Sequence, residues 1–189
     1  MMNTLESQVV GILIRDSHFD DLWVTREPVA VPYFDNALVT VTFDGVAEEL
    51  PDCLREADAA LRNFLQLSPA DRLAATAVVL ANYQEMLDAA DIEPLDLPEP
   101  SAIWQHVQPR NLVVTEETEG AERDFYIQIE GECDWEEEHG IALVFRQGRM
   151  LTRLSQYDGH LTEAHAYGRA DIADPLMAQF YAAFGRPGN

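Results

Sequence analysis

The 189-residue chain is long enough to bury a sizeable core, and its 47% hydrophobic and 9% aromatic content is typical of a globular protein rather than a disordered one. It has 34 acidic and 12 basic residues, a formal charge of −22, and every basic residue is arginine. This balance argues against nucleic acids and anionic membranes as partners, because both attract lysine and arginine. It leaves basic proteins, cations or plain solubility as the meaning of the charge.

Cysteine usage and hydropathy favour a cytoplasmic protein. Cys53 and Cys133 are far apart and belong to no C-x-x-C pair, so we expect two free thiols in a reducing compartment. The longest apolar run, residues 74–81, is far shorter than the ~20 residues that cross a bilayer. No basic residue precedes the apolar residues 9–14, so no signal peptide is expected.

The first part of the chain predicts two strands. Residues 9–14 form a short apolar run, and residues 37–43 alternate and are rich in β-branched side chains before a turn at Asp44 and Gly45. Pro28 and Pro32 indicate an irregular connection between the two strands.

Two helices are predicted next. Apolar residues recur at helical spacing over residues 54–65 after Asp52, a suitable N-cap. Ser68, Pro69 and Asp71 then form a cap, a first-position proline and a first-turn acid, which predicts a second helix to about residue 90. We expect this helix to lie against a sheet through a wide apolar face: Leu73, Ala77, Leu80, Tyr83, Met86 and Leu87.

A connector separates these helices from the second half. Residues 92–100 are proline-rich and acidic, and they are the one candidate boundary within a single domain, residues 1–189. Ser101 is predicted to cap a short helical turn that carries Ile103 and Trp104.

The second half is rich in strand patterns. Strands are predicted at residues 112–115 and 125–135, and a hairpin at residues 141–154 turns through residues 146–149. One helical turn is predicted between Thr162 and Gly168, and a last helix between Asp174 and Gly185. This order predicts an α+β domain: a mostly antiparallel sheet, a helix pair packed on one face, and a C-terminal helix.

Residues 130–140, E-G-E-C-D-W-E-E-E-H-G, carry six carboxylates, a cysteine, a tryptophan and a histidine. Alternation along a strand predicts one buried face: Phe125, Ile127, Ile129, Cys133 and Trp135. It predicts that the following residues face outward: Tyr126, Gln128, Glu130, Glu132 and Asp134. Gly131 indicates a bulge, which would reset the alternation beyond it.

The outward carboxylates have two interpretations. They could bind a cation or a basic partner, or they could be a solvated strand face. Next-but-one residues of a strand are ~7 Å apart, and in water their repulsion is about 0.6 kcal/mol per pair, too little to require a ligand. The histidines His139, His160 and His165 match no zinc motif, and we expect neither a metal nor a cofactor.

Three functional hypotheses follow. The first is a non-enzymatic acidic module that docks a basic protein partner, with this candidate surface: Glu130, Glu132, Asp134, Trp135, Glu138, His139, Asp158 and His160. The second is a metal-binding protein or hydrolase that uses the carboxylates and histidines of residues 132–160. The third is structural: Glu138 and His139 would fix a strand-to-strand turn through hydrogen bonds to the backbone. No common hydrolase or nucleotide-binding motif is present, which makes an enzyme the less expected outcome.

The run from Cys133 to Gly148, C-D-W-E-E-E-H-G-I-A-L-V-F-R-Q-G, resembles the hallmark of an uncharacterised bacterial family, domain of unknown function 6985. The matching residues are Trp135, Glu138, His139, Gly140, Val144, Phe145 and Gly148. The resemblance covers residues 35–155, whereas residues 157–162 and the C-terminal helix depart from the family pattern. It implies no activity, because none is established for the family. A role as an immunity or regulatory protein rests on analogy with other small acidic bacterial proteins.

Overall fold

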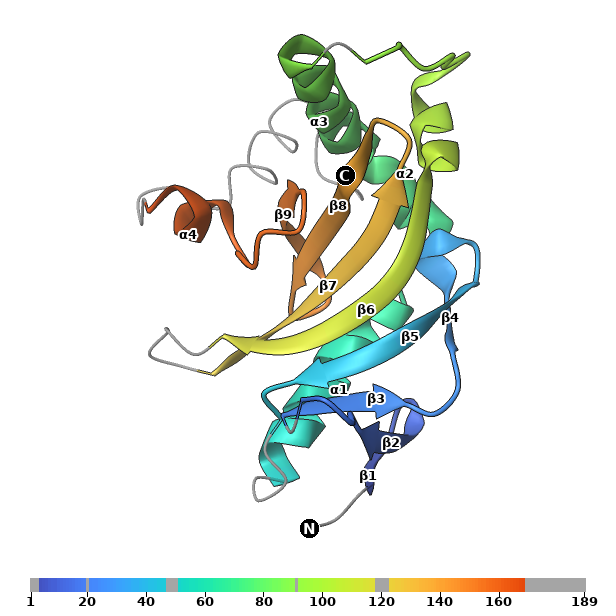
Figure 1. Ribbon diagram of the computed structural model, residues 1–189. Helices are drawn as coiled ribbons and strands as arrows, with labels where there is room; N and C mark the ends of the chain where they lie inside the picture. The colour runs from blue at the N-terminus through green and yellow to red at the C-terminus, as the bar shows by residue number, and fades with distance from the viewer. Residues whose placement is uncertain (1–3, 20, 47–50, 91, 118–122, 169–189) are drawn as a thin grey trace, which may run out of the picture.

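A computed structural model describes residues 4–19, 21–46, 51–90, 92–117 and 123–168, and its strands form one large sheet (Figure 1). The strands are β1 (Thr4–Ser7), β2 (Gly11–Arg15), β3 (Leu22–Thr25), β4 (Val29–Val31), β5 (Ala37–Asp44), β6 (Val107–Glu117), β7 (Asp124–Cys133), β8 (Glu136–Arg146) and β9 (Met150–Ser155). The helices are α1 (Pro51–Leu65), α2 (Pro69–Ala74), α3 (Thr76–Ala89) and α4 (Glu163–Tyr167), with 3₁₀ helices η1 (Pro32–Phe34) and η2 (Pro100–His106).

The sheet has the order β1-β2-β3-β5-β6-β7-β8-β9, and β4 pairs with β5. Among the described strands only the β5–β6 pair is parallel, because the helices α1 to α3 and η2 carry the chain back between these two strands. All the other described pairs are antiparallel, so the predicted α+β class with a mostly antiparallel sheet is confirmed.

The N-terminal strands differ from the prediction. The strand expected at residues 9–14 is β2, and it begins only at Gly11. It forms an antiparallel hairpin with β1, a strand that was not predicted. A buried carboxylate on α1 holds that hairpin: Asp58 accepts hydrogen bonds from Ser7 Oγ (2.5 Å) and from the Gln8 amide (2.7 Å). The region expected to be irregular contains β3, β4 and η1. The pattern missed them because these elements are three or four residues long and are stabilised by partners far along the chain.

The helical region is confirmed in outline and corrected in detail. The Ser68–Asp71 capping box is present, but the helix expected to reach residue 90 breaks at Ala75 into α2 and α3. The apolar periodicity therefore does not run through the break: Tyr83 is buried as expected, whereas Leu73 is 50% exposed. The strand contacts of α1 are mainly with β6 and β7, whereas α3 contacts η2 and β9. The packing of the two helices as a pair on one face stays a prediction.

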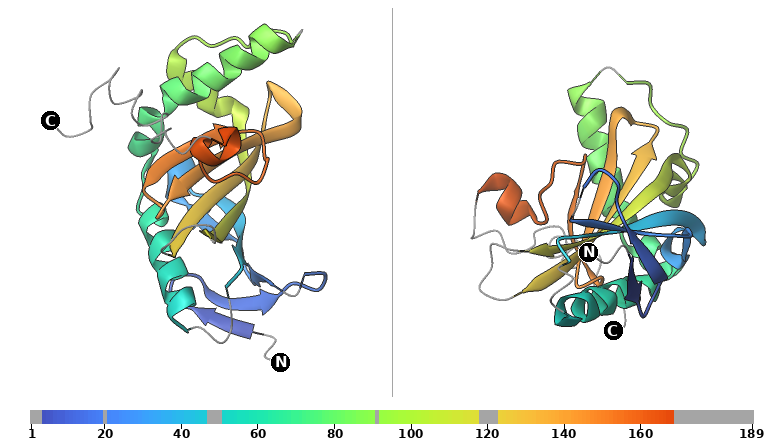
Figure 2. Two further views of the ribbon diagram at one scale, coloured as in Figure 1. Left: turned by 90° about the vertical axis from the view of Figure 1, so that its left-hand side faces the viewer. Right: turned by 60° about the horizontal axis from the view of Figure 1, so that its bottom comes forward.

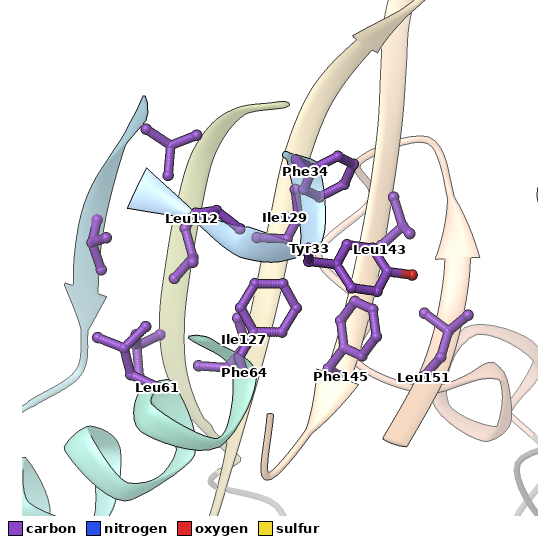
Figure 3. Close-up of a cluster of buried hydrophobic side chains, with 14 of the residues drawn as sticks. Tyr33, Phe34, Leu61, Phe64, Leu112, Ile127, Ile129, Leu143, Phe145 and Leu151 are labelled. Carbon is purple, nitrogen blue, oxygen red and sulfur yellow. The ribbon is translucent and has the colours of Figure 1, made fainter. Parts of the chain in front are cut away.

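One face of the sheet carries the hydrophobic core (Figure 3). Tyr33 of η1, Phe64 of α1 and Phe145 of β8 pack together, with ring centroids 5.0–5.7 Å apart. The side chains that β7 was expected to bury are buried, namely Phe125, Ile127, Ile129 and Cys133. The bulge expected at Gly131 is confirmed by a register shift there in the β7–β8 pair.

The other face of the sheet, which we call the outer face, is not simply solvated. Tyr126 and Gln128 were expected to face outward, yet they are 4% and 5% exposed. Residues 156–168, which we call the strap, lie over this side of the sheet and contain α4, as the views in Figures 1 and 2 show. The cap of α4 by Thr162 and its end at Gly168 are confirmed. The helix predicted at residues 174–185 lies outside the described residues.

Among the residues that the structure describes, no helix has both the length and the apolar content needed to cross a membrane.

Candidate functional site

The outer face is built by the register of its strands. Thr42, Val113, Gln128, Val144 and Arg153 are successive partners across β5 to β9, so their side chains lie on one side of the sheet. Neighbouring strand residues such as Phe43 and Val114 point to the core instead and are fully buried, which fixes the direction of this row.

The strap is held over the outer face by a buried arginine. Arg153 donates to Glu163 (2.9 Å) and to Asp158, and its side chain is only 8% exposed. Thr152 adds a hydrogen bond to the carbonyl of Leu161 (2.8 Å). Burial raises the pKa of Glu163 although Arg153 opposes this, whereas the bonds from Arg153 and the His160 amide lower the pKa of Asp158 against the effect of burial.

A cavity of about 670 Å³, which we call the outer pocket, opens between the strap and the sheet. Side chains from four separate segments line it: Asp44, Thr115, Gln128, Glu130, Tyr157 and His160. Asp44 lies at the end of β5, Glu130 lies on β7, and Tyr157 and His160 lie on the strap. The fold therefore assembles a concave, acidic site from residues that lie far apart along the chain, such as Asp44 and His160.

The charges of Asp44 and Glu130 are not neutralised. Glu130 accepts hydrogen bonds from the amides of Gln128 (3.0 Å) and Asn111 (3.4 Å), but within the described residues neither carboxylate forms an ion pair with an arginine or a histidine. Burial, with the nearby charge of Asp21, raises the pKa of Asp44 above its ordinary value. Negative charge is thus concentrated here in a partly desolvated place, where attraction for a cation is strongest.

Tyr157 completes this end of the outer pocket. Its side chain is 58% exposed, and partial burial together with the charges of Glu130 and Asp44 raises its pKa, so the phenol stays neutral. An exposed aromatic ring beside two carboxylates can stack on a guanidinium or ammonium group. At another point of the lining, Glu117 lies 3.6 Å from Nδ1 of His165, so protonation of this histidine would add a local ion pair.

The hairpin between β7 and β8, which we call the hairpin tip (residues 131–140), contains most of the residues that the sequence singled out. Two of its five carboxylates contact basic side chains of the β6 region: Glu132 pairs with Arg110 (2.5 Å), and Asp134 with Nδ1 of His106 (2.8 Å). The hydrogen bond from Arg110 lowers the pKa of Glu132. These two acids thus lie on the β6 side of the tip and do not join the outer pocket.

Trp135 is buried at the hairpin tip. It is 4% exposed, its indole N–H donates to Asn82 Oδ1 (3.0 Å), and its ring contacts Tyr83 of α3 (5.8 Å between centroids). The candidate surface therefore has no exposed tryptophan anchor at its centre.

The segment Glu138–His139–Gly140 does not turn the chain. The reversal occurs earlier, at Asp134 and Trp135, and β8 already begins at Glu136. Glu136, rather than Glu138, fixes the local backbone: its Oε1 accepts from the amides of Glu138 (3.2 Å) and His139 (3.1 Å). His139 is half-exposed, and its ring contacts the same carboxylate (3.2 Å).

Gly140 has a structural reason to be glycine. Its φ is +65°, and a side chain there would overlap the carbonyl oxygen of Gly131, where the bulge brings the two strands together. In the turn after β8, Gly148 also has φ of +65°, and a side chain would meet the Ala60 carbonyl of α1. Both family-pattern glycines thus permit close backbone contact.

Both cysteines are buried thiols that form no disulfide with another described residue, as expected. Burial raises the pKa of Cys133 to about 12, so its thiol is protonated at neutral pH and is a poor nucleophile.

Asp158 belongs to a different cavity from Glu130 and His160. A cavity of about 420 Å³ lies between α3 and the strap, and Asp158, Glu136 and Arg153 are in its lining. Among the candidate residues, the structure brings Glu130 and His160 together, and it separates them from Glu132, Asp134, Glu138 and His139. In the described part of the chain, no group of three or more His, Cys, Asp or Glu side chains is arranged to hold a metal ion.

Three important residues of the outer pocket were missed: Asp44, Glu117 and Tyr157. Asp44 was interpreted as a turn residue before Gly45, although the alternation of residues 37–43 already predicts that it faces away from the core. The parallel β5–β6 pairing that brings it near β7 leaves no signal in the sequence.

Comparison with known proteins gives a family and no activity. No curated protein and no solved structure matches the chain. A family model described as Domain of unknown function (DUF6985) matches residues 13–161, which is further in both directions than the resemblance at residues 35–155. The match begins within β2, includes β3 to β9 and ends in the first part of the strap. The chain therefore belongs to the DUF6985 family.

Proposed function

We propose that this protein is a non-enzymatic, acidic, cytoplasmic binding module, of the immunity or regulatory type, and that it docks a basic protein partner at the outer pocket. The observation that carries the proposal is the pair of carboxylates Asp44 and Glu130, which have no cationic partner among the described residues, in a cavity that also contains the exposed ring of Tyr157. A guanidinium or ammonium group of the partner would satisfy both carboxylates and stack on the ring.

The total charge of −22 supports this function in a second way. A strongly negative protein attracts a basic partner at longer range in low salt, where the Debye length is greater, which raises the association rate and lowers the rate of encounters with other acidic proteins. The outer pocket would then provide the close contacts. Long-range attraction and local recognition therefore make separate, measurable contributions.

A labelled peptide of alternating arginine and glycine tests the proposal by fluorescence anisotropy. We expect it to bind the wild-type protein and to bind more weakly at 300 mM than at 20 mM salt, roughly as screening requires. The double variant Asp44→Asn, Glu130→Gln should lose at least about tenfold in affinity, the effect of ~1.4 kcal/mol.

The matched control changes the net charge equally at the hairpin tip. The double variant Glu132→Gln, Glu138→Gln also removes two charges, and we expect it to bind within about twofold of wild type, since these acids are outside the outer pocket. Equal losses in the two double variants would mean that only total charge matters, and absence of binding at low salt would contradict the proposed function.

A further inference from the structure

We infer that the docking surface continues from the outer pocket onto the outer face of β2 and β3, where it receives an apolar part of the basic partner; this rests on the proposed function above. Ile14 pairs with Val24, and Val24 with Thr42, so this row continues the one that crosses the outer pocket. Ile12 has the same orientation as Ile14, because the two lie two residues apart on one strand.

This part of the outer face carries apolar side chains that the described residues leave open. On this face Ile12 is 44% exposed and Ile14 39%, whereas Leu13 between the two isoleucines is fully buried in the core. The strap lies near the β8–β9 end of the sheet, and β1 to β3 form the opposite end (Figures 1 and 2). Grouped apolar exposure on a monomer surface marks an interaction site more often than chance.

The apolar patch, which we define as Ile12, Ile14 and Val24, adjoins the acidic site. Leu22 lies two residues before Val24 on β3 and therefore on the same face, and it is the strand partner of Asp44. At the far end of the patch, Glu6 is the strand partner of Ile12, and the amide of Arg26, just after β3, donates to the Ile12 carbonyl (3.3 Å).

Charge decides what kind of partner covers the patch. Two copies of a chain with a charge of −22 repel each other, and a second copy would bring its own Asp21 and Asp44 toward these same groups. A basic protein with an apolar ridge beside its cationic side chain matches both halves of the surface. The partner is thus expected to insert a cation into the outer pocket and to place apolar side chains on β2 and β3.

Two labelled peptides with equal numbers of arginines test this inference, one with glycine and one with leucine at the alternate positions. We expect the wild-type protein to bind the arginine–leucine peptide at least fivefold more tightly at the same ionic strength. In the double variant Ile12→Thr, Ile14→Thr this preference should fall to less than twofold, because threonine keeps the strand propensity and removes apolar contact area. The variant Leu73→Ser, which changes a 50% exposed leucine on α2, should keep the full preference.

The outcomes separate the inference from the proposed function. If neither peptide binds, the proposed function fails and the inference fails with it. If both bind the wild type equally, or if the double variant keeps the fivefold preference, only the inference is overturned. If the Leu73→Ser variant loses the preference as well, the leucine peptide is binding to exposed apolar residues in general, which also overturns it.

Discussion

The hairpin tip and the outer pocket are both acidic, but their charges differ in what surrounds them. At the hairpin tip, Glu132 pairs with Arg110 and Asp134 with His106. In the outer pocket, Asp44 and Glu130 have hydrogen-bonding or aromatic neighbours and no cation among the described residues. The comparison teaches that a dense acidic run in a sequence can be structurally compensated, whereas two isolated acids from distant segments can form the uncompensated site.

The largest expected effect is a loss of stability without a loss of binding, at the buried tryptophan of the hairpin tip. Trp135→Ala should lower the free energy of unfolding by about 4 kcal/mol, because it removes a buried indole and leaves Asn82 without its partner. The fraction that remains folded should bind the arginine–glycine peptide as wild type does. Urea unfolding followed by circular dichroism measures the first quantity, and anisotropy the second.

The matched aromatic substitution in the outer pocket should weaken binding and leave stability nearly unchanged. Tyr157→Ala should change stability by less than about 0.5 kcal/mol, since the ring is mostly exposed, and should weaken peptide binding several-fold. If the tryptophan variant loses binding while the tyrosine variant keeps it, the roles assigned to the two regions are wrong.

A second comparison uses two glycines with positive φ. Gly140→Ala should cost about 3 kcal/mol, because the new methyl group overlaps the Gly131 carbonyl in addition to the backbone strain. Gly159→Ala in the wall of the outer pocket should cost only about 1 kcal/mol, since nothing lies within 4 Å of the added atom. Equal losses in urea unfolding would show that the hairpin tip is not held as tightly as its geometry indicates.

The smallest expected effects are on the pH dependence of the unfolding free energy. Removing a carboxylate should stabilise the protein in the outer pocket and destabilise it at the hairpin tip. The folded-state pKa of Asp44 is raised, so its protonated form contributes stability that is fully present below the unfolded-state pKa and is lost as pH rises through the folded-state value. Asp44→Asn should therefore stabilise the protein at pH 7, within about 0.5 kcal/mol, and the gain should vanish in acid.

Glu132 should behave in the opposite way. Its folded-state pKa is lowered by Arg110, so the ionised form contributes stability that is present above the unfolded-state pKa and is lost as pH falls through the folded-state value. Glu132→Gln should destabilise slightly at pH 7 and not at all in strong acid. Chemical unfolding of both variants at pH 7 and pH 3 measures this difference, and like signs at pH 7 would contradict it.

Local patterns in the sequence were enough to predict much of the fold. The alternation of Phe125, Ile127 and Ile129, the Ser68–Asp71 capping box and the Thr162–Gly168 turn are short-range features, and each is present in the structure. Features that depend on distant partners could not be predicted. The β1–β2 hairpin needs Asp58, and the break at Ala75 has no proline or glycine to mark it.

The candidate site was predicted less well than the fold, for a related reason. Charge density marked the hairpin tip, but a count of carboxylates does not reveal that Arg110 and His106 lie opposite two of them. Asp44 and Tyr157 each stand in an ordinary turn in the sequence, and they meet only through the parallel β5–β6 pair and the strap. Of the predicted surface, Glu130 and His160 both line the outer pocket, and the role of the surface stays a prediction.

The uncompensated charge in the outer pocket can be measured most directly by NMR titration of the side-chain carboxyl carbons. We expect Asp44 to titrate above the 3.8 of an ordinary aspartate and Glu132 to titrate below the 4.5 of an ordinary glutamate. Added arginine–glycine peptide should lower the titration midpoint of Asp44 and leave that of Glu132 unchanged. A midpoint for Asp44 at or below 3.8 in the free protein, or a peptide response at Glu132 alone, would contradict the account.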